Sequence, residues 1–231
     1  MKLLKPLALA FALLGATAAQ AGISVYNDQA AFLSATEATS ATGALPSLTG
    51  SRNVAHIGSV RLADVNGYGF WVGGLEAHQP SDWTTLLPGH EIAINHVENL
   101  DVVFDAPVFS AGFGFAEPGP QPPANGSSPY ANNASYPYAD STFTVTLKAG
   151  ASVVGAFSFN APDETGSFVG VWSHLAFDRM DIRETAGGIE DDYFGEFYSG
   201  AVAMPVPEPG TWALLAAGLG LLASRGRRLA A

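Results

Sequence analysis

The 231-residue chain contains no cysteine. Its fold therefore cannot rest on disulfide bonds, and it has neither a cysteine nucleophile nor a thiolate ligand for a metal ion. Basic residues are also scarce, because ten Lys and Arg stand against 21 Asp and Glu and leave a formal net charge of −11 at pH 7. This balance argues against a nucleic-acid-binding protein, which needs a basic face to contact phosphates.

The few basic residues are concentrated at the two ends of the chain. Lys2 and Lys5 lie at the start and three arginines lie near the end, while all acidic residues fall between Asp28 and Glu208. Only five basic residues share that acidic stretch, which carries 16 negative charges in excess. Such a body repels acidic polymers and stays soluble. The alternative use of this charge is attraction of divalent cations.

The first 21 residues are typical of a secretory signal peptide. Two lysines are followed by an apolar run, Leu7–Ala19, and small residues occupy Ala19 and Ala21, where a signal peptidase accepts them. Cleavage is therefore expected before Gly22. The alternative is an uncleaved membrane anchor, but the run is shorter than the roughly 20 apolar residues that a span needs.

The C-terminal region combines three features. Pro207-Glu208-Pro209 prevents helix formation, the uncharged run Thr211–Ala223 predicts a hydrophobic helix, and an arginine cluster follows. At 13 residues the run is marginal for a membrane span, and the arginines favour a cytoplasmic end. The candidate processing residues at the two ends of the chain are Ala19, Ala21, Pro207, Glu208, Pro209, Arg225, Arg227 and Arg228.

This tail resembles a PEP-CTERM sorting signal, a region also labelled the ice-binding-protein C-terminal domain without implying ice binding. In proteins with such a tail, an exosortase is thought to cut near the Pro-Glu-Pro element, and the hosts are typically Gram-negative bacteria that make exopolysaccharide. The resemblance covers about the last 25 residues. It implies an exported protein that the C-terminal helix first tethers to the inner membrane and that then reaches the cell surface or medium. A plain tail anchor is the alternative.

Residues 22–204, between the signal peptide (1–21) and the sorting signal with its short transmembrane helix (205–231), predict one all-β domain. Thr142–Lys148 alternates strictly, with every second residue apolar, and a hairpin turn follows at Lys148–Ala151. In the next strand, Val153, Phe157 and Phe159 are expected to share a face. Further strands are expected at 54–65, 67–75, 102–104, 108–116, 168–172, 180–184 and 193–204.

One helix is expected at Asp28–Ala35, with Asn27 as its cap and Ala31, Phe32 and Ala35 facing inward. Many short strands, Gly and Pro punctuation and almost no helix predict a single β-sandwich of jelly-roll type. The signal helix and the C-terminal hydrophobic helix flank this domain.

Two groups of residues are weak candidates for ligand contacts. The Pro-rich loop Glu117–Asp140 carries three tyrosines that can stack on sugar rings or can simply pack the loop down. Acidic clusters on predicted loops can supply the carboxylate ligands of calcium, although solvated loop charge is the simpler interpretation. The glycan candidates are Tyr130, Tyr136 and Tyr138, and the calcium candidates are Asp163, Glu164, Glu190, Asp191 and Asp192.

Catalytic motifs are absent from the sequence. No serine lies in a Gly-x-Ser-x-Gly elbow. His90 and His96 are six residues apart, whereas a helical zinc motif needs histidines four apart so that both face one ion. Ile92, Ile94 and Val97 indicate a strand here, on which the two histidines would lie about 20 Å from each other, too far for a single ion. We therefore expect a non-enzymatic exported protein, associated with the surface or extracellular matrix and contacting exopolysaccharide, with no cofactor except possible calcium. The expected partners are signal peptidase, an exosortase-type enzyme and, transiently, the inner membrane. The alternative is an extracellular carbohydrate-active hydrolase on the same fold.

Overall fold

The computed structural model describes residues 22–73, 87–94, 97–117, 140–163, 165–187 and 192–203. Of these residues, 64% lie in strands and 6% in helix, so the prediction of an all-β fold is confirmed. The predicted signal helix and C-terminal helix lie outside the described residues. The elements are β1 (Ile23–Tyr26), α1 (Gln29–Thr36), β2 (Thr39–Ser40), β3 (Val54–Ile57), β4 (Val60–Asp64), β5 (Phe70–Gly73), β6 (Glu91–Ile94), β7 (Leu100–Glu117), β8 (Thr142–Ala149), β9 (Ser152–Phe159), β10 (Thr165–Ala186) and β11 (Tyr193–Gly200).

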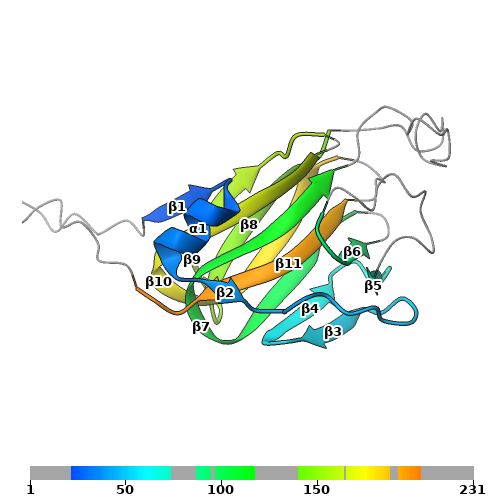
Figure 1. The fold of residues 1–231 in the computed structure, drawn as a ribbon, viewed down its shortest axis with the longest axis horizontal. Coiled ribbons are helices and arrows are strands. Elements are labelled where there is room, and N and C mark those ends of the chain that lie inside the picture. Colours follow the sequence, from blue (N-terminus) through cyan, green and yellow to red (C-terminus); the bar gives the residue numbers. More distant parts are fainter. Residues whose placement is uncertain are drawn as a thin grey trace, which may run out of the picture.

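The strands form one open antiparallel sheet with the order β5-β6-β11-β7-β10-β8-β9. Four short strands attach to this path: β4 pairs with β7 and carries β3, β1 pairs with β10, and β2 pairs with β11. Phe70 of β5 and Leu147 of β8, near opposite ends of this order, belong to the same buried cluster. The sheet therefore folds over a shared core in a sandwich-like manner (Figure 1).

Two pairs of predicted strands are each one long strand: 102–104 and 108–116 are parts of β7, and 168–172 and 180–184 are parts of β10. The sequence predicts a break at Asp105–Pro107, but β7 runs through it for 18 residues. Opposite this point the register with β10 jumps, from Phe177 facing Val108 to Arg179 facing Val103. Pro107 has no N–H to donate and lies in the stretch of β7 that this jump leaves unpaired. The irregularity interrupts the pairing with β10 while the strand itself continues.

Aromatic side chains fill the centre of the core. The Phe115 ring lies 5.1–5.4 Å from the rings of Phe143, Phe159 and Phe194. The predicted inward face of β8 is confirmed, since Phe143, Val145 and Leu147 are fully buried. The prediction for Val153 is wrong, because this side chain is 62% exposed. Because the pairing of β8 with β9 shifts register between Leu147 and Lys148, Val153 does not share a face with Phe157 and Phe159.

The helix begins one residue later than predicted and buries different residues. Its N-cap is Asp28, whose Oδ1 accepts a hydrogen bond from the Ala31 N–H at 2.7 Å, and Asn27 precedes the cap. Phe32 and Thr36 are the buried residues of α1. Ala31 and Ala35 are exposed, so their predicted inward position is wrong. The inward face is centred on Phe32 and Thr36, and Ala31 and Ala35 each lie about 100° round the helix from them.

Both chain ends of the domain lie at the same end of the sheet. Ile23 of β1 faces Ser173 of β10, and Gly200 of β11 faces Ser110 of β7. Since Ser110 also faces Trp172 of β10, these strand ends are neighbours, on the left in Figure 1. We call this the terminal end, and the opposite end of β7, at Glu117, the acidic end. No helix within the described ranges has the length and apolar character needed to cross a bilayer.

Candidate functional site

A groove lies on the outer face of the sheet beside the start of α1. It has a volume of about 260 Å³ and is lined by residues of α1, β7, β10 and β11, among them Gln29, Gly114, Phe168 and Tyr198. We call it the Tyr198 groove. A second cavity of about 390 Å³ adjoins it, and the residues common to both are Asn27, Gly166, Ser167 and Phe168. The two cavities are therefore adjacent, and we treat them together as one depression.

Glycines on the outer face of the sheet make this depression possible. In β7 the inward residues are large aromatics, whereas the outward ones include Gly112 and Gly114. A Cβ on Gly112 would lie 2.6 Å from Cζ of Phe168, and one on Gly114 would lie 3.3 Å from Cδ2 of Leu87. The absent side chains let Phe168 and Leu87 lie flat against the backbone. The alternation of glycine and phenylalanine at residues 112–115 is the feature of the sequence that could have indicated this surface.

The polar rim of the groove is held by hydrogen bonds. The Tyr198 hydroxyl donates to Oε2 of Glu196 at 3.0 Å, and the Ser40 hydroxyl donates to Oε1 of the same carboxylate. Burial, together with this carboxylate, raises the pKa of Tyr198, and a hydrogen bond from Gln29 opposes the shift. The rim thus presents acceptors in fixed positions.

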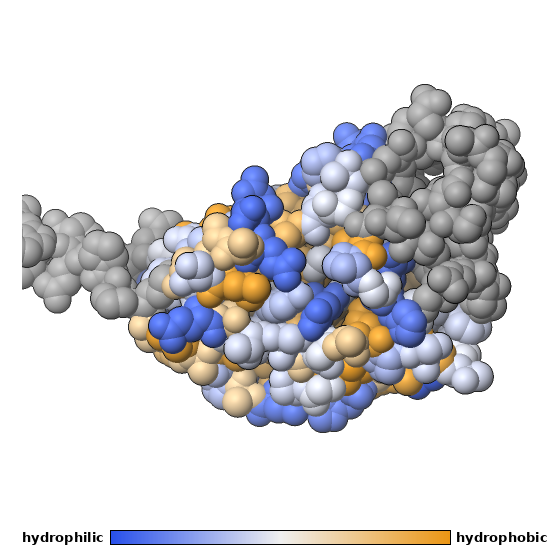
Figure 2. Space-filling model, viewed as in Figure 1, coloured by the Kyte–Doolittle hydropathy of each residue, from blue (hydrophilic) through white to orange (hydrophobic). Residues whose placement is uncertain are grey.

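The charge of the groove is negative. Asp28 and Glu196 are the two ionisable carboxylates on its wall, and no Lys or Arg lies among the described residues that line either cavity. In the face shown in Figure 2, hydrophobic and hydrophilic residues are interspersed rather than separated into large patches. The surroundings therefore suit a ligand that is neutral and has both apolar and polar surfaces.

At the acidic end, the structure brings together three carboxylates that are distant in sequence. Oxygens of Glu117, Asp140 and Asp163 lie within 4.8 Å of one another, and Glu117 is buried. Glu117 accepts a hydrogen bond from the Ser141 N–H at 2.6 Å, and Asp140 accepts one from the Asn160 amide at 2.7 Å. Asp163 was a predicted calcium ligand, whereas the other two were missed. They are the two ends of the predicted Pro-rich loop, and the closing of a loop brings its ends together.

Asp192 lies at the same end of the sheet. It is fully buried and precedes Tyr193, which faces Ala116, the neighbour of Glu117. The two acidic clusters of the sequence therefore approach one end of the sheet, and calcium binding there stays a prediction. The remaining predicted site residues lie outside the described residues: Glu164, Glu190, Asp191, Tyr130, Tyr136, Tyr138 and all the processing residues.

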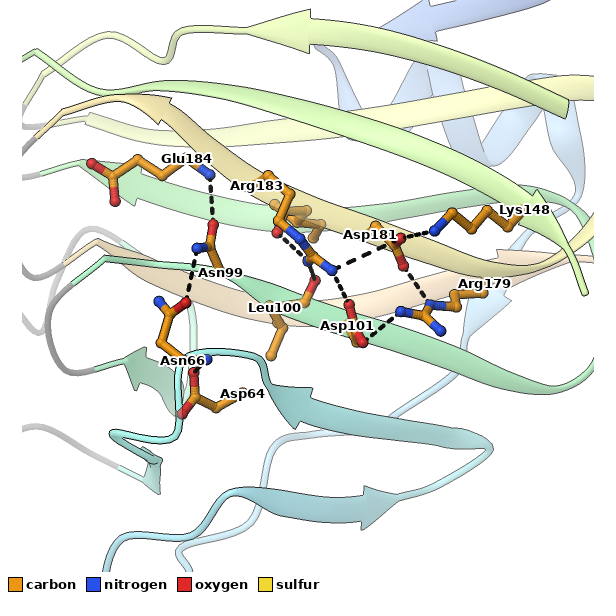
Figure 3. A network of polar contacts seen from close by, with 11 residues as sticks. Asp64, Asn66, Asn99, Leu100, Asp101, Lys148, Arg179, Asp181, Arg183 and Glu184 are labelled. Carbon is orange, nitrogen blue, oxygen red and sulfur yellow. Dashed lines mark hydrogen bonds and ion pairs between the residues drawn. The ribbon is translucent and has the colours of Figure 1, made fainter. Parts of the chain in front are cut away.

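A second polar cluster joins β7, β8 and β10 (Figure 3). Asp101 and Asp181 face each other directly on neighbouring strands, an arrangement that destabilises a sheet when the charges are alike. Three cations compensate. Arg179 and Arg183 bind Asp101 at 2.6 and 2.5 Å, and Arg179 and Lys148 bind Asp181.

The cations of this cluster outweigh the cost of burying Asp181. Burial by itself would raise the pKa of Asp181, but hydrogen bonds from Lys148 and Arg179 and the charges of Arg179 and Arg183 leave it below its ordinary value. The carboxylates in turn raise the pKa of Arg179 against the effect of burial. Three of the five basic residues of the acidic stretch are engaged here, so this cluster holds the sheet together.

The predicted strand at the His90 segment is confirmed, since β6 covers Glu91–Ile94. This supports the exclusion of a helical zinc motif, in which both histidines must face one ion. Glu91 itself is 2% exposed, so its carboxyl is removed from water. Burial raises its pKa to about 7, and the main chain of Leu87 offsets part of the shift.

Comparison with known proteins concerns the C-terminal region. Residues 205–228 match the PEP-CTERM protein-sorting motif. The chain carries a PEP-CTERM sorting signal. The PEP-CTERM motif indicates an exported protein of Gram-negative bacteria that an exosortase processes. None of the curated proteins matches the chain.

Proposed function

We propose that the β domain is a non-enzymatic module that exosortase sorting delivers to the cell surface or extracellular matrix, where it contacts exopolysaccharide. The observation that carries this proposal is the depression on the outer face of the sheet, which is open, amphipathic and held in shape by its own hydrogen bonds. The PEP-CTERM signal supplies the route to a compartment in which polysaccharide is available.

The carboxylates of the groove support a binding role. Asp28 caps α1, and Glu196 accepts hydrogen bonds from Ser40 and Tyr198. Both therefore have structural tasks, whereas a hydrolase needs one carboxyl that protonates the leaving group and one that attacks or activates water. The hydrolase alternative stays testable because both carboxylates line the same groove.

The intact mass of the mature protein from its native host tests the processing part of the proposal. We expect loss of residues 1–21 by signal peptidase and of the tail from near Pro207. A mature protein that keeps its tail would identify a permanent membrane anchor, and one that keeps both ends would overturn the export scheme.

Sedimentation of the mature protein with exopolysaccharide from the same host tests the binding part. We expect the protein in the pellet and no new reducing ends in the polysaccharide. Growth of reducing ends that stops in Asp28→Asn and Glu196→Gln would establish the hydrolase instead. Asn caps a helix as well as Asp does, so the first variant keeps α1 intact.

A further inference from the structure

We infer that the Tyr198 groove binds a neutral carbohydrate chain rather than an acidic one, with Asn27 at the junction of its two cavities. This inference rests on the proposed contact with exopolysaccharide and names the class of ligand and the place where it binds.

The shape of the depression suits a chain rather than a single small molecule. Its two parts, of about 260 and 390 Å³, meet at Asn27 and Phe168. Each part is near the lower bound of ligand pockets, about 300 Å³, and the two adjacent parts together are well within the usual range. An extended ligand can occupy both parts at once.

The two parts differ in chemistry in a way that matches a sugar ring. The larger cavity is bounded by Tyr26 and by the exposed apolar side chains of Val25 and Pro162. The Tyr198 groove is bounded by Gln29, Glu196 and Tyr198. A pyranose has an apolar face of C–H groups and a rim of hydroxyls, so the first can pack on aromatic and aliphatic carbon while the second meets polar groups.

The hydrogen-bonding capacity of the rim favours hydroxyl donors. An ionised carboxylate offers about four lone-pair sites. Glu196 accepts one hydrogen bond from Ser40 and one from Tyr198. Asp28 accepts one from the Ala31 N–H at Oδ1. The lone pairs that remain, together with the exposed amide of Asn27, can receive sugar hydroxyls without any rearrangement of the rim.

The same carboxylates disfavour an acidic polymer. Uronate, sulfate or phosphate groups would meet Asp28 and Glu196 at close range, with no Lys or Arg among the described lining residues to offset the repulsion. The net charge of −11 adds a long-range repulsion of the same sign. The groove therefore disfavours negatively charged polymers and favours chains that carry hydroxyl groups.

The test is binding of the mature protein to immobilised dextran, galactomannan and alginate at low salt. We expect retention on at least one of the two neutral polymers and about tenfold weaker retention on alginate. Asn27→Trp places a large side chain where both cavities meet and is expected to abolish binding. Asn53→Trp is the matched control, because Asn53 is also exposed and lies outside both cavities.

Each outcome separates this inference from the broader proposal. If the protein sediments with native exopolysaccharide but binds neither neutral polymer, the assignment of ligand class is overturned and the proposed association with the matrix stands. Equal binding to alginate overturns the role of the two carboxylates. Binding that persists in a folded Asn27→Trp protein overturns the groove as the site.

Discussion

Gly58 shows how a single residue holds the β3–β4 turn against the rest of the domain. Its φ is +60°, and a Cβ at this position would lie 2.2 Å from the carbonyl oxygen of Ala41. The next residue, Ser59, donates its N–H to the same oxygen at 2.9 Å. The turn is thus both left-handed and in close contact with backbone that cannot move aside.

We predict that Gly58→Ala destabilises the protein far more than Gly150→Ala. Gly150 has nearly the same φ, +58°, but a Cβ there meets nothing within 4 Å. The second variant should cost about 1 kcal/mol for the left-handed backbone alone, and the first should cost about 2 kcal/mol more for the clash. Urea unfolding of both variants measures the difference. Equal costs would show that the 41–42 segment yields easily.

Glu91 makes the stability of the protein depend on pH. The unfolded carboxyl loses its proton near its ordinary pKa of 4.5, while the folded one keeps its proton up to about 7. The folded state therefore binds more protons between these values, and the free energy of unfolding decreases as pH rises through this range. Above pH 7 the Glu91 carboxyl is ionised in both the folded and the unfolded state, and the free energy of unfolding decreases no further on its account.

We predict that Glu91→Gln removes this loss. The free energy of unfolding of the variant, relative to that of the parent, should be roughly 3 kcal/mol higher at pH 8 than at pH 4, because each pKa unit corresponds to about 1.4 kcal/mol. Urea unfolding at both pH values gives the two differences. Glu37→Gln, at an exposed position, is the control and should show no such trend. A constant difference for Glu91→Gln would mean that the buried carboxyl is ionised throughout.

At the scale of whole strands, the ion cluster on β7, β8 and β10 connects elements that the chain separates widely. We predict that Asp181→Asn lowers the free energy of unfolding by about 2 kcal/mol at pH 7, because Lys148 and Arg179 then lose a charged acceptor. The pKa of Asp181 is lowered, so its contribution is present above pH 3.8 and disappears as pH falls through the folded value.

The pH dependence of the same variant provides the check. Thermal melting of parent and Asp181→Asn should converge in strong acid and diverge as pH rises. Asp105→Asn serves as a control, since Asp105 is exposed and contacts His56 alone in this part of the sheet. A more stable Asp181→Asn protein would show that repulsion between the two facing aspartates outweighs their cation contacts.

Strand patterns are readable from the sequence where one face is buried and regular. The residues 142–148 alternate because β8 has one face in the core, so the prediction succeeded there. It failed at Asp105–Pro107, where local composition indicates a break but the pairing on both sides keeps β7 continuous. It also misplaced the cap of α1, because Asn27 and Asp28 are adjacent and both are good caps, so the sequence alone does not choose between them.

The candidate sites were less predictable, since they combine distant residues. The Tyr198 groove joins positions near 28, 167 and 196, and no local pattern specifies that these strands are neighbours. The glycines of β7 are visible in the sequence, but their meaning depends on Phe168 lying over them. The sorting signal was predictable because a linear motif acts without a fold.

At the scale of the whole molecule, calcium stays the prediction for the acidic end. Three carboxylates within 4.8 Å repel one another, and a divalent cation would relieve that repulsion. We expect millimolar calcium to raise the melting temperature of the mature protein and Asp163→Asn to reduce the rise, with Asp105→Asn unchanged. A melting temperature that calcium does not change would show that these three carboxylates do not bind calcium.

Both chain ends of the domain lie at one end of the sheet, so a tail that is held in place would hold the domain by its terminal end. Six residues separate Gly200 from Pro207, and even fully stretched they reach only about 20 Å. Any anchor or enzyme holding the tail therefore sits directly beneath the terminal end. Glu117 is seven residues along β7 from Ser110, which raises it about 23 Å above that base. In a layer of such molecules on a cell, the acidic ends would face outward, and the terminal ends, with their attachment points, would lie beneath the domains.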